Sequence, residues 1–130
     1  MSTSTTNGVK VDVRCRWVPE RSDPARRSFF FAYQVTITNV GERVVQLVSR
    51  HWIISNADGH TEHVKGPGVV GETPILAPGQ SFTYTSFCPL DTPVGAMQGT
   101  YQMVYPEVRG EPGFDAEVAP FTLAVPSALN

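Results

Sequence analysis

The chain has 130 residues, a formal net charge of −2 and a hydrophobic fraction of 41%. A chain of this length fits one domain that buries roughly 65 to 70% of its unfolded surface. Its eleven glycines and eleven prolines lower the expected helix content, because both residue types interrupt helices. The slightly acidic balance supplies no basic field, so we expect neither nucleic acid nor anionic lipid as a partner.

The first eight residues are polar and lack an apolar stretch after a basic start. They predict a flexible tail over 1–8, rather than an export signal or anchor, followed by a single domain over 9–126. No apolar run approaches the roughly 20 residues of a spanning helix, which predicts no membrane insertion. Cys15 and Cys88 are too few for a disulfide framework, so we interpret them as reduced thiols of a cytoplasmic protein.

Apolar and polar side chains alternate along most of the chain. In the run 9–17 every odd position is apolar and every even position is charged, which is typical of a half-buried strand. Pro19 and Pro24 end this run, because proline has no amide donor for a sheet. The run 29–38 repeats the alternation with aromatic and β-branched residues, which favour strands.

The alternation continues through the second half of the chain. A third strand is expected over 44–55, followed by a turn at Asp58-Gly59, which tolerates positive φ, and an antiparallel return over 60–65. The segment 66–79 is rich in proline and glycine and predicts a loop with room for a short strand. Further strands are expected over the ranges 80–88, 96–105 and 114–125.

Seven to eight strands joined by short turns predict an all-β fold, namely a two-layer antiparallel β-sandwich of the immunoglobulin or fibronectin type III-like kind. Either Trp17 or Trp52 would be the pivot of its core. We interpret the one basic cluster as solvated surface at a strand edge rather than as an anion site. This cluster comprises Arg14, Arg16, Arg21, Arg26 and Arg27.

An ordered set of motifs lies between residues 49 and 103. It comprises Ser49-Arg50-His51-Trp52-Ile53-Ile54, Asp58-Gly59, the segment VKGPGVVGETP at 64–74, Leu76-Ala77-Pro78-Gly79, Phe82, Tyr84, Ser86, Gly95, Met97, Gly99, Tyr101 and Met103. Through these motifs the chain, from about residue 9 to residue 125, strongly resembles the ApaG family.

The resemblance implies a fibronectin type III-like sandwich in a small bacterial cytosolic protein without an established activity. The family is associated with cobalt and magnesium efflux, and it is similar to a domain fused to some eukaryotic F-box proteins, which favours a role in protein interaction. Bacterial members often lie beside a diadenosine tetraphosphate hydrolase. The resemblance therefore also keeps pyrophosphate-containing nucleotides as candidate ligands.

Three glycines have the GxGxxG spacing of the dinucleotide-binding fingerprint: Gly66, Gly68 and Gly71. The fingerprint requires a helix that begins at these glycines, and the prolines that follow exclude such a helix. A weaker version remains open, in which free amides of the loop cradle a phosphate with help from Lys65 and Arg50. The alternative is a purely structural turn.

Three histidines suggest a metal site: His51, His60 and His63. Positions three apart on a strand face opposite sides, so His60 and His63 are not expected to share a face. His51 is expected to approach His63 across the hairpin. Imidazoles with a carboxylate can hold a transition metal, but histidines in such a pattern are more often ordinary polar residues of the surface.

Arg50 and Trp52 are expected to share a strand face with Ile54. In one interpretation Arg50 forms a structural ion pair, for which the candidate carboxylates are Asp58, Glu62 and Glu72. In the other, Arg50 and Trp52 form an exposed anchor for a protein partner, since both residue types are enriched at interface hot spots.

No serine occupies a nucleophile elbow, and neither cysteine lies in the sequence context of a known nucleophile. We therefore expect a noncatalytic binding or regulatory module without a cofactor, which recognises a protein partner and can form a homodimer through an edge strand. The alternative function is binding of a divalent metal or a pyrophosphate-containing nucleotide through the loop Gly66–Gly71.

Overall fold

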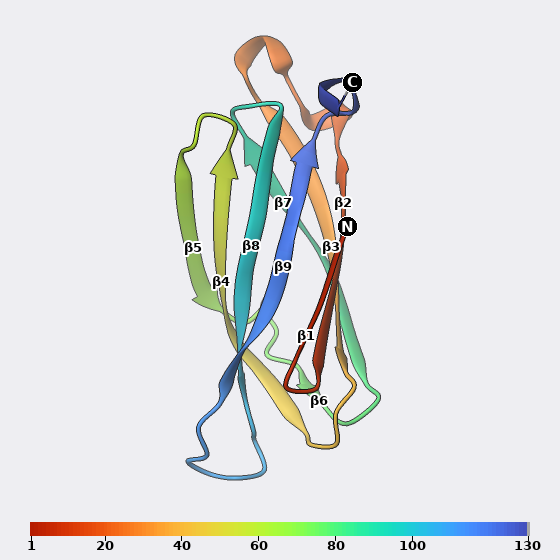
Figure 1. The fold of residues 1–130 in the computed structure, drawn as a ribbon, viewed down its shortest axis with the longest axis vertical. Helices are drawn as coiled ribbons and strands as arrows, with labels where there is room; N and C mark the ends of the chain where they lie inside the picture. The colour runs from red at the N-terminus through yellow and green to blue at the C-terminus, as the bar shows by residue number, and fades with distance from the viewer. Residues whose placement is uncertain (130) are drawn as a thin grey trace.

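The alternation of apolar and polar side chains produces long strands that face a common core. In the computed structural model, which describes residues 1–129, the odd-numbered Val9, Val11 and Val13 are almost fully buried, whereas Arg14 is exposed. The strands assemble into two antiparallel sheets that pack face to face (Figure 1). The predicted all-β sandwich is thereby confirmed.

Each sheet joins strands that are distant in sequence. The four-stranded sheet has the order β1 (Ser2–Thr6), β2 (Val9–Trp17), β3 (Phe29–Asn39) and β7 (Ser81–Leu90). The five-stranded sheet has the order β5 (Thr61–Pro67), β4 (Val45–Asn56), β8 (Val94–Val104) and β9 (Phe114–Ala124), with β6 (Ile75–Leu76) paired to β4. Three short 3-10 helices complete the elements: η1 (Pro19–Arg21), η2 (Pro24–Arg26) and η3 (Pro126–Leu129).

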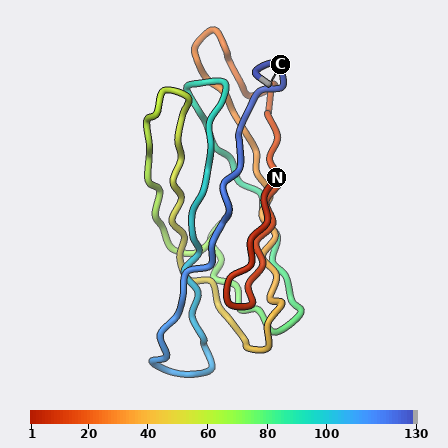
Figure 2. The backbone as a smooth tube through the Cα atoms, in the orientation of Figure 1, coloured from red at the N-terminus to blue at the C-terminus, as the bar shows by residue number. Residues whose placement is uncertain are grey.

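The described residues contain nine strands, against the seven to eight predicted. One addition is the two-residue strand β6, which lies in the loop where a short strand was expected. The other is β1, which occupies the segment predicted as a flexible tail. β1 pairs with β2 from Ser2↔Val13 to Thr6↔Val9, and Figure 2 shows the two segments running side by side. Polar side chains do not prevent this strand, because the ladder satisfies its backbone groups.

β1 and β2 also cover the outer edge of β9. The hydroxyl of Thr6 accepts a hydrogen bond from the amide of Glu117 at 3.1 Å, and the Cys15 thiol donates to the carbonyl of Thr122 at 3.2 Å. The sandwich is thus closed along the side where β9 meets β1 and β2. On the other side β5 and β7 are not hydrogen bonded to one another.

Trp52, rather than Trp17, is the pivot of the core. Its indole is 3% exposed and contacts Tyr33, Tyr101 and Phe121 edge to face, with ring centroids 5.4, 6.0 and 6.0 Å away. These rings come from both sheets, so this cluster joins the two layers. Trp17 is only partly buried and donates from Nε1 to the Ser22 hydroxyl at 2.9 Å.

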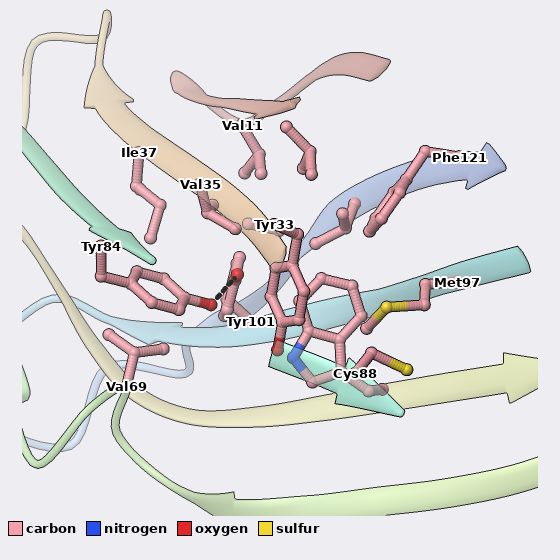
Figure 3. Close-up of a cluster of buried hydrophobic side chains, with 14 of the residues drawn as sticks. Val11, Tyr33, Val35, Ile37, Val69, Tyr84, Cys88, Met97, Tyr101 and Phe121 are labelled. Atoms are coloured by element: carbon pink, nitrogen blue, oxygen red, sulfur yellow. Dashed lines mark hydrogen bonds between the residues drawn. The ribbon is translucent and has the colours of Figure 1, made fainter. Parts of the chain in front are cut away.

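A pair of tyrosine hydroxyls lies inside the same core. Tyr84 of β7 and Tyr101 of β8 are hydrogen bonded at 2.5 Å, as the dashed line in Figure 3 shows. Burial raises the pKa of both phenols well above the ordinary value, so both remain neutral. On folding, each hydroxyl loses its hydrogen bonds to water, and the bond to the other tyrosine replaces them.

We predict that Tyr84→Phe and Tyr101→Phe each lower the free energy of unfolding by about 1 to 3 kcal/mol, because each leaves one buried hydroxyl without a partner. The double variant is expected to be more stable than the sum of the two losses predicts, since it removes both polar groups. Urea unfolding of the four proteins measures the coupling. Strict additivity of the two losses would contradict this interpretation.

Candidate functional site

The Gly66–Gly71 loop is held by hydrogen bonds within the protein. Arg50 Nη1 donates to the carbonyls of Pro67 and Gly68 at 3.0 and 2.9 Å, and the Gly68 amide donates to the carbonyl of Val48 at 2.9 Å. A Cβ at Gly68 would lie 2.3 Å from the Glu72 carbonyl oxygen, so glycine is required here by a close backbone approach. The amide of Gly68 is therefore engaged and not free for a phosphate.

The end of the loop is a tight two-residue turn. Val69 and Glu72 exchange both backbone hydrogen bonds at 2.8 Å, and the central residues Val70 and Gly71 have φ of 45° and 79°. Positive φ at both central positions defines a type I′ turn. No helix follows Gly71, which agrees with the exclusion of a dinucleotide fingerprint.

Within residues 1–129 Arg50 has no carboxylate partner, in contrast to the predicted ion pair. Its guanidinium covers Gly66, whose Cβ would lie 3.0 Å from Nη1, and it donates to the loop carbonyls instead. Trp52 lies in the core, so the exposed anchor of Arg50 and Trp52 is wrong. Alternation correctly predicts that both side chains face inward. In the structure, the inward-facing Trp52 is buried and Arg50 is bonded to the loop, so neither forms an exposed anchor.

Lys65 is exposed on the outward side of β5, opposite His51 of β4. Together with Ser49 and Gln102 these residues line a shallow hollow of about 320 Å³. The Ser49 hydroxyl donates to Gln102 Oε1 at 2.8 Å. Arg50 and Gly66 also line this hollow, which is therefore cationic, but the Gly68 amide of the predicted nest donates to the carbonyl of Val48 instead.

The three histidines do not converge. His51 Nε2 and His63 Nδ1 lie 2.8 Å apart across the β4–β5 hairpin, as predicted from the turn at Asp58-Gly59. His60 lines a different hollow, at the end of the sandwich beside Arg27 and Asp91. Within residues 1–129, no group of three or more histidine, cysteine or acidic side chains is placed to hold a metal ion.

Both cysteines are free thiols. Cys88 is buried, and burial raises its pKa to about 12; burial also raises the pKa of Cys15. A thiol with a raised pKa is protonated at neutral pH and is a poor nucleophile. Cys88 therefore packs as a small apolar side chain in the core, and the partly buried Cys15 packs against it.

An exposed cluster that sequence analysis missed lies on the outer face of the four-stranded sheet. Phe30 of β3 and Phe87 of β7 stack with ring centroids 5.4 Å apart. The Arg21 guanidinium lies over both rings, 4.4 Å from the centroid of Phe30 and 5.6 Å from that of Phe87. We call these three residues the aromatic–arginine cluster.

A signal for this cluster was present in the sequence. In β3, Phe30 occupies one of the alternate positions that otherwise hold polar residues such as Gln34 and Thr36. In β7, Phe87 occupies the same kind of position as Thr85. An aromatic residue at an outward position is therefore the feature to search for. The convergence of Arg21 on both rings could not be predicted, because it depends on how η1 folds back over the sheet.

The same outer face is positively charged although the chain is acidic overall. β2 and η1 place Lys10, Arg14, Arg16 and Arg21 there, against the carboxylates of Asp12 and Glu20. The ion pairs Lys10–Asp12 and Arg16–Glu20 are exposed and 3.9 Å long, so they are weak. Within the described residues Arg14 and Arg21 have no carboxylate partner within 4.0 Å.

A two-sheet antiparallel fold with a hydrogen-bonded loop and an aromatic core defines a small β-sandwich module. The model of the ApaG domain (DUF525) matches residues 19–105. The chain belongs to the ApaG family, and the predicted resemblance is confirmed. It is 54% identical over 130 residues to Protein ApaG of Anaeromyxobacter dehalogenans strain 2CP-C, covering all of both chains, and 50% identical to Protein ApaG of Azotobacter vinelandii, covering 94% of each.

Solved structures support the same fold. The crystal structure of the putative ApaA protein from Bordetella pertussis matches with a TM-score of 0.85 and 47% identity, over 91% of this chain and 94% of that chain. The C-terminal domain of wzt matches with a TM-score of 0.55 and 12% identity, over 95% of this chain and 77% of that chain, which is a likeness of fold alone. No helix within residues 1–129 is long and apolar enough to cross a membrane.

Val70 is a strained residue, because a β-branched side chain rarely adopts a positive φ. It is also 57% exposed. We predict that Val70→Asn raises the free energy of unfolding by about 1 kcal/mol, since asparagine tolerates the left-handed conformation. Ile75, which is 56% exposed and has no positive φ, provides the control: Ile75→Asn should give no gain. Urea unfolding measures the free energy of unfolding of each variant. If Val70→Asn is no more stable than the parent, the backbone at Val70 is not strained.

Proposed function

We propose that this chain is a noncatalytic protein-binding module whose contact surface is the outer face of the four-stranded sheet. The observation that carries the proposal is the aromatic–arginine cluster, in which two phenyl rings and a guanidinium are stacked at the surface. Single exposed apolar residues are common on soluble proteins. Here an exposed ring, Phe87, stacks on the half-buried Phe30 beneath an arginine without a carboxylate partner among the described residues, and aromatic residues with arginine are the composition typical of an interface core.

The cluster is also organised before any partner binds. Stacking between Phe30 and Phe87 and the placement of Arg21 over both rings restrict three side chains that would otherwise lose rotamer freedom on association. Preorganisation of this kind favours binding, because less conformational entropy is lost when the partner arrives. In this proposal the chain influences cobalt and magnesium efflux, with which the family is associated, by binding the partner protein.

The role of the cluster can be tested by photo-crosslinking inside cells of the natural host. We predict that a benzophenone amino acid at position 87 forms an adduct with another protein, and that adding Arg21→Glu reduces the adduct. The matched control is position 108, because Val108 and Phe87 are both 48% exposed. Val108 lies in the β8–β9 connection, outside the cluster.

An adduct at position 87 that is absent at position 108 supports the proposal. Adducts of the same mass and yield at both positions, or none at position 87, would contradict it. Circular dichroism and unfolding of each variant establish that the substitutions leave the sandwich folded, since Phe87 and Arg21 both lie at the surface.

A further inference from the structure

β7 differs from the other sheet edges of the molecule. β9 is covered by β1 and β2, β1 has only five residues, and β5 carries Glu62 and Lys65 and ends at Pro67. Charges, prolines and short length are the usual protection of an edge strand. β7 has ten residues, none of them charged, and its single proline is next to its end.

The edge is also regular. β7 pairs with β3 from Thr38↔Ser81 to Phe29↔Leu90 without a register shift. A bulge would bend the strand and spoil its outer side for pairing. The free side of β7 is therefore a regular edge, without a bulge, along all ten residues.

The direction of the backbone groups can be worked out from the two ends of β3. At one end of β3 the amide of the odd-numbered Asn39 donates to the carbonyl of Gln80, on the side of β7. At the other end the carbonyl of the even-numbered Phe30 accepts from the amide of Val18, on the side of β2. Because direction alternates along an antiparallel ladder, the even-numbered residues of β7 bond to β3. The odd-numbered residues direct their backbone groups away from the sheet, and those with an amide are Ser81, Thr83, Thr85 and Phe87.

No loop or side chain within the described residues bonds to these outward backbone groups. The threonine hydroxyls are used across the outer face instead, where Thr83 is hydrogen bonded to Thr36 at 3.1 Å. The side chains of the same residues share that face with the aromatic–arginine cluster. An added strand would therefore meet both an unpaired backbone and the cluster.

We propose that β7 binds an extended acidic segment of a partner protein as an additional strand. This inference rests on the proposed function and names the form of the partner. The bound segment would place an apolar side chain against Phe87 and carboxylates on the same face, toward Arg21 and the positive outer face. Backbone pairing provides affinity, and the alternate side chains provide specificity.

The charge of the outer face favours an acidic partner over a second copy of this chain. Pairing of two β7 strands would join two positively charged faces into one continuous sheet. Like charges brought close together oppose association. A segment with carboxylates would instead be attracted to the face, most strongly at low ionic strength.

The test uses a phage-displayed library of random short peptides, selected against the intact chain. We expect enriched peptides to alternate apolar and acidic residues. Their affinity should fall about tenfold for Arg21→Glu and for Thr85→Pro, a substitution that removes an outward amide but no hydrogen bond to β3. If Thr85→Pro does not fold, the same peptides with N-methylated backbone amides provide the equivalent test on the unaltered chain.

Three outcomes would overturn strand addition: no peptide is enriched, enriched peptides are unaffected by N-methylation and by Thr85→Pro, or light scattering shows a dimer that Thr85→Pro dissociates. The last result would show that a second copy occupies the edge. If crosslinking at position 87 still captures a partner, the protein-binding function stands and only its mode through β7 fails.

Discussion

The two sheets of this sandwich are closed along one side only, and that asymmetry determines which backbone groups remain available. Every strand must satisfy its amides and carbonyls or leave them to water. On one side the N-terminal hairpin of β1 and β2 lies against β9, with the Thr6 hydroxyl accepting from Glu117. On the other side β5 and β7 each end a sheet without pairing to one another. Figure 1 shows this arrangement of the strands.

The aromatic core makes this open side stable enough to persist. Trp52 contacts rings from both sheets, and the hydrogen-bonded pair of Tyr84 and Tyr101 joins β7 to β8 (Figure 3). β7 is therefore held from its inner face and from β3, while its outer edge makes no contribution to the ladder. Such a strand can bind another segment without first rearranging, which limits the entropic cost of association.

Much of the fold was predictable because period-two alternation specifies both the strand and the face it buries. The ranges 9–17, 44–55 and 114–125 correspond closely to β2, β4 and β9. β1 was not predictable in this way, since its serines and threonines show no apolar alternation and the strand depends on its pairing with β2. The choice between Trp17 and Trp52 was equally a matter of packing between distant strands.

The candidate site was less predictable than the fold. The antiparallel hairpin correctly brought His51 to His63, but His60 lies in the turn before β5, so its separation from His63 does not come from strand alternation. Alternation could not show that Arg50 donates to loop carbonyls, because those bonds depend on the path of the chain after Pro67. The aromatic–arginine cluster combines η1, β3 and β7, three elements that only the tertiary fold brings together.

The central claim is that β7 presents an unpaired edge, and native-state amide hydrogen exchange measures this directly. At a concentration where the chain is monomeric, the amides of Thr83, Thr85 and Phe87 are predicted to exchange rapidly. Those of Tyr84 and Ser86, which face β3, are predicted to be strongly protected. Equal protection of the two sets in the monomer would show that the edge is already covered and would contradict the account.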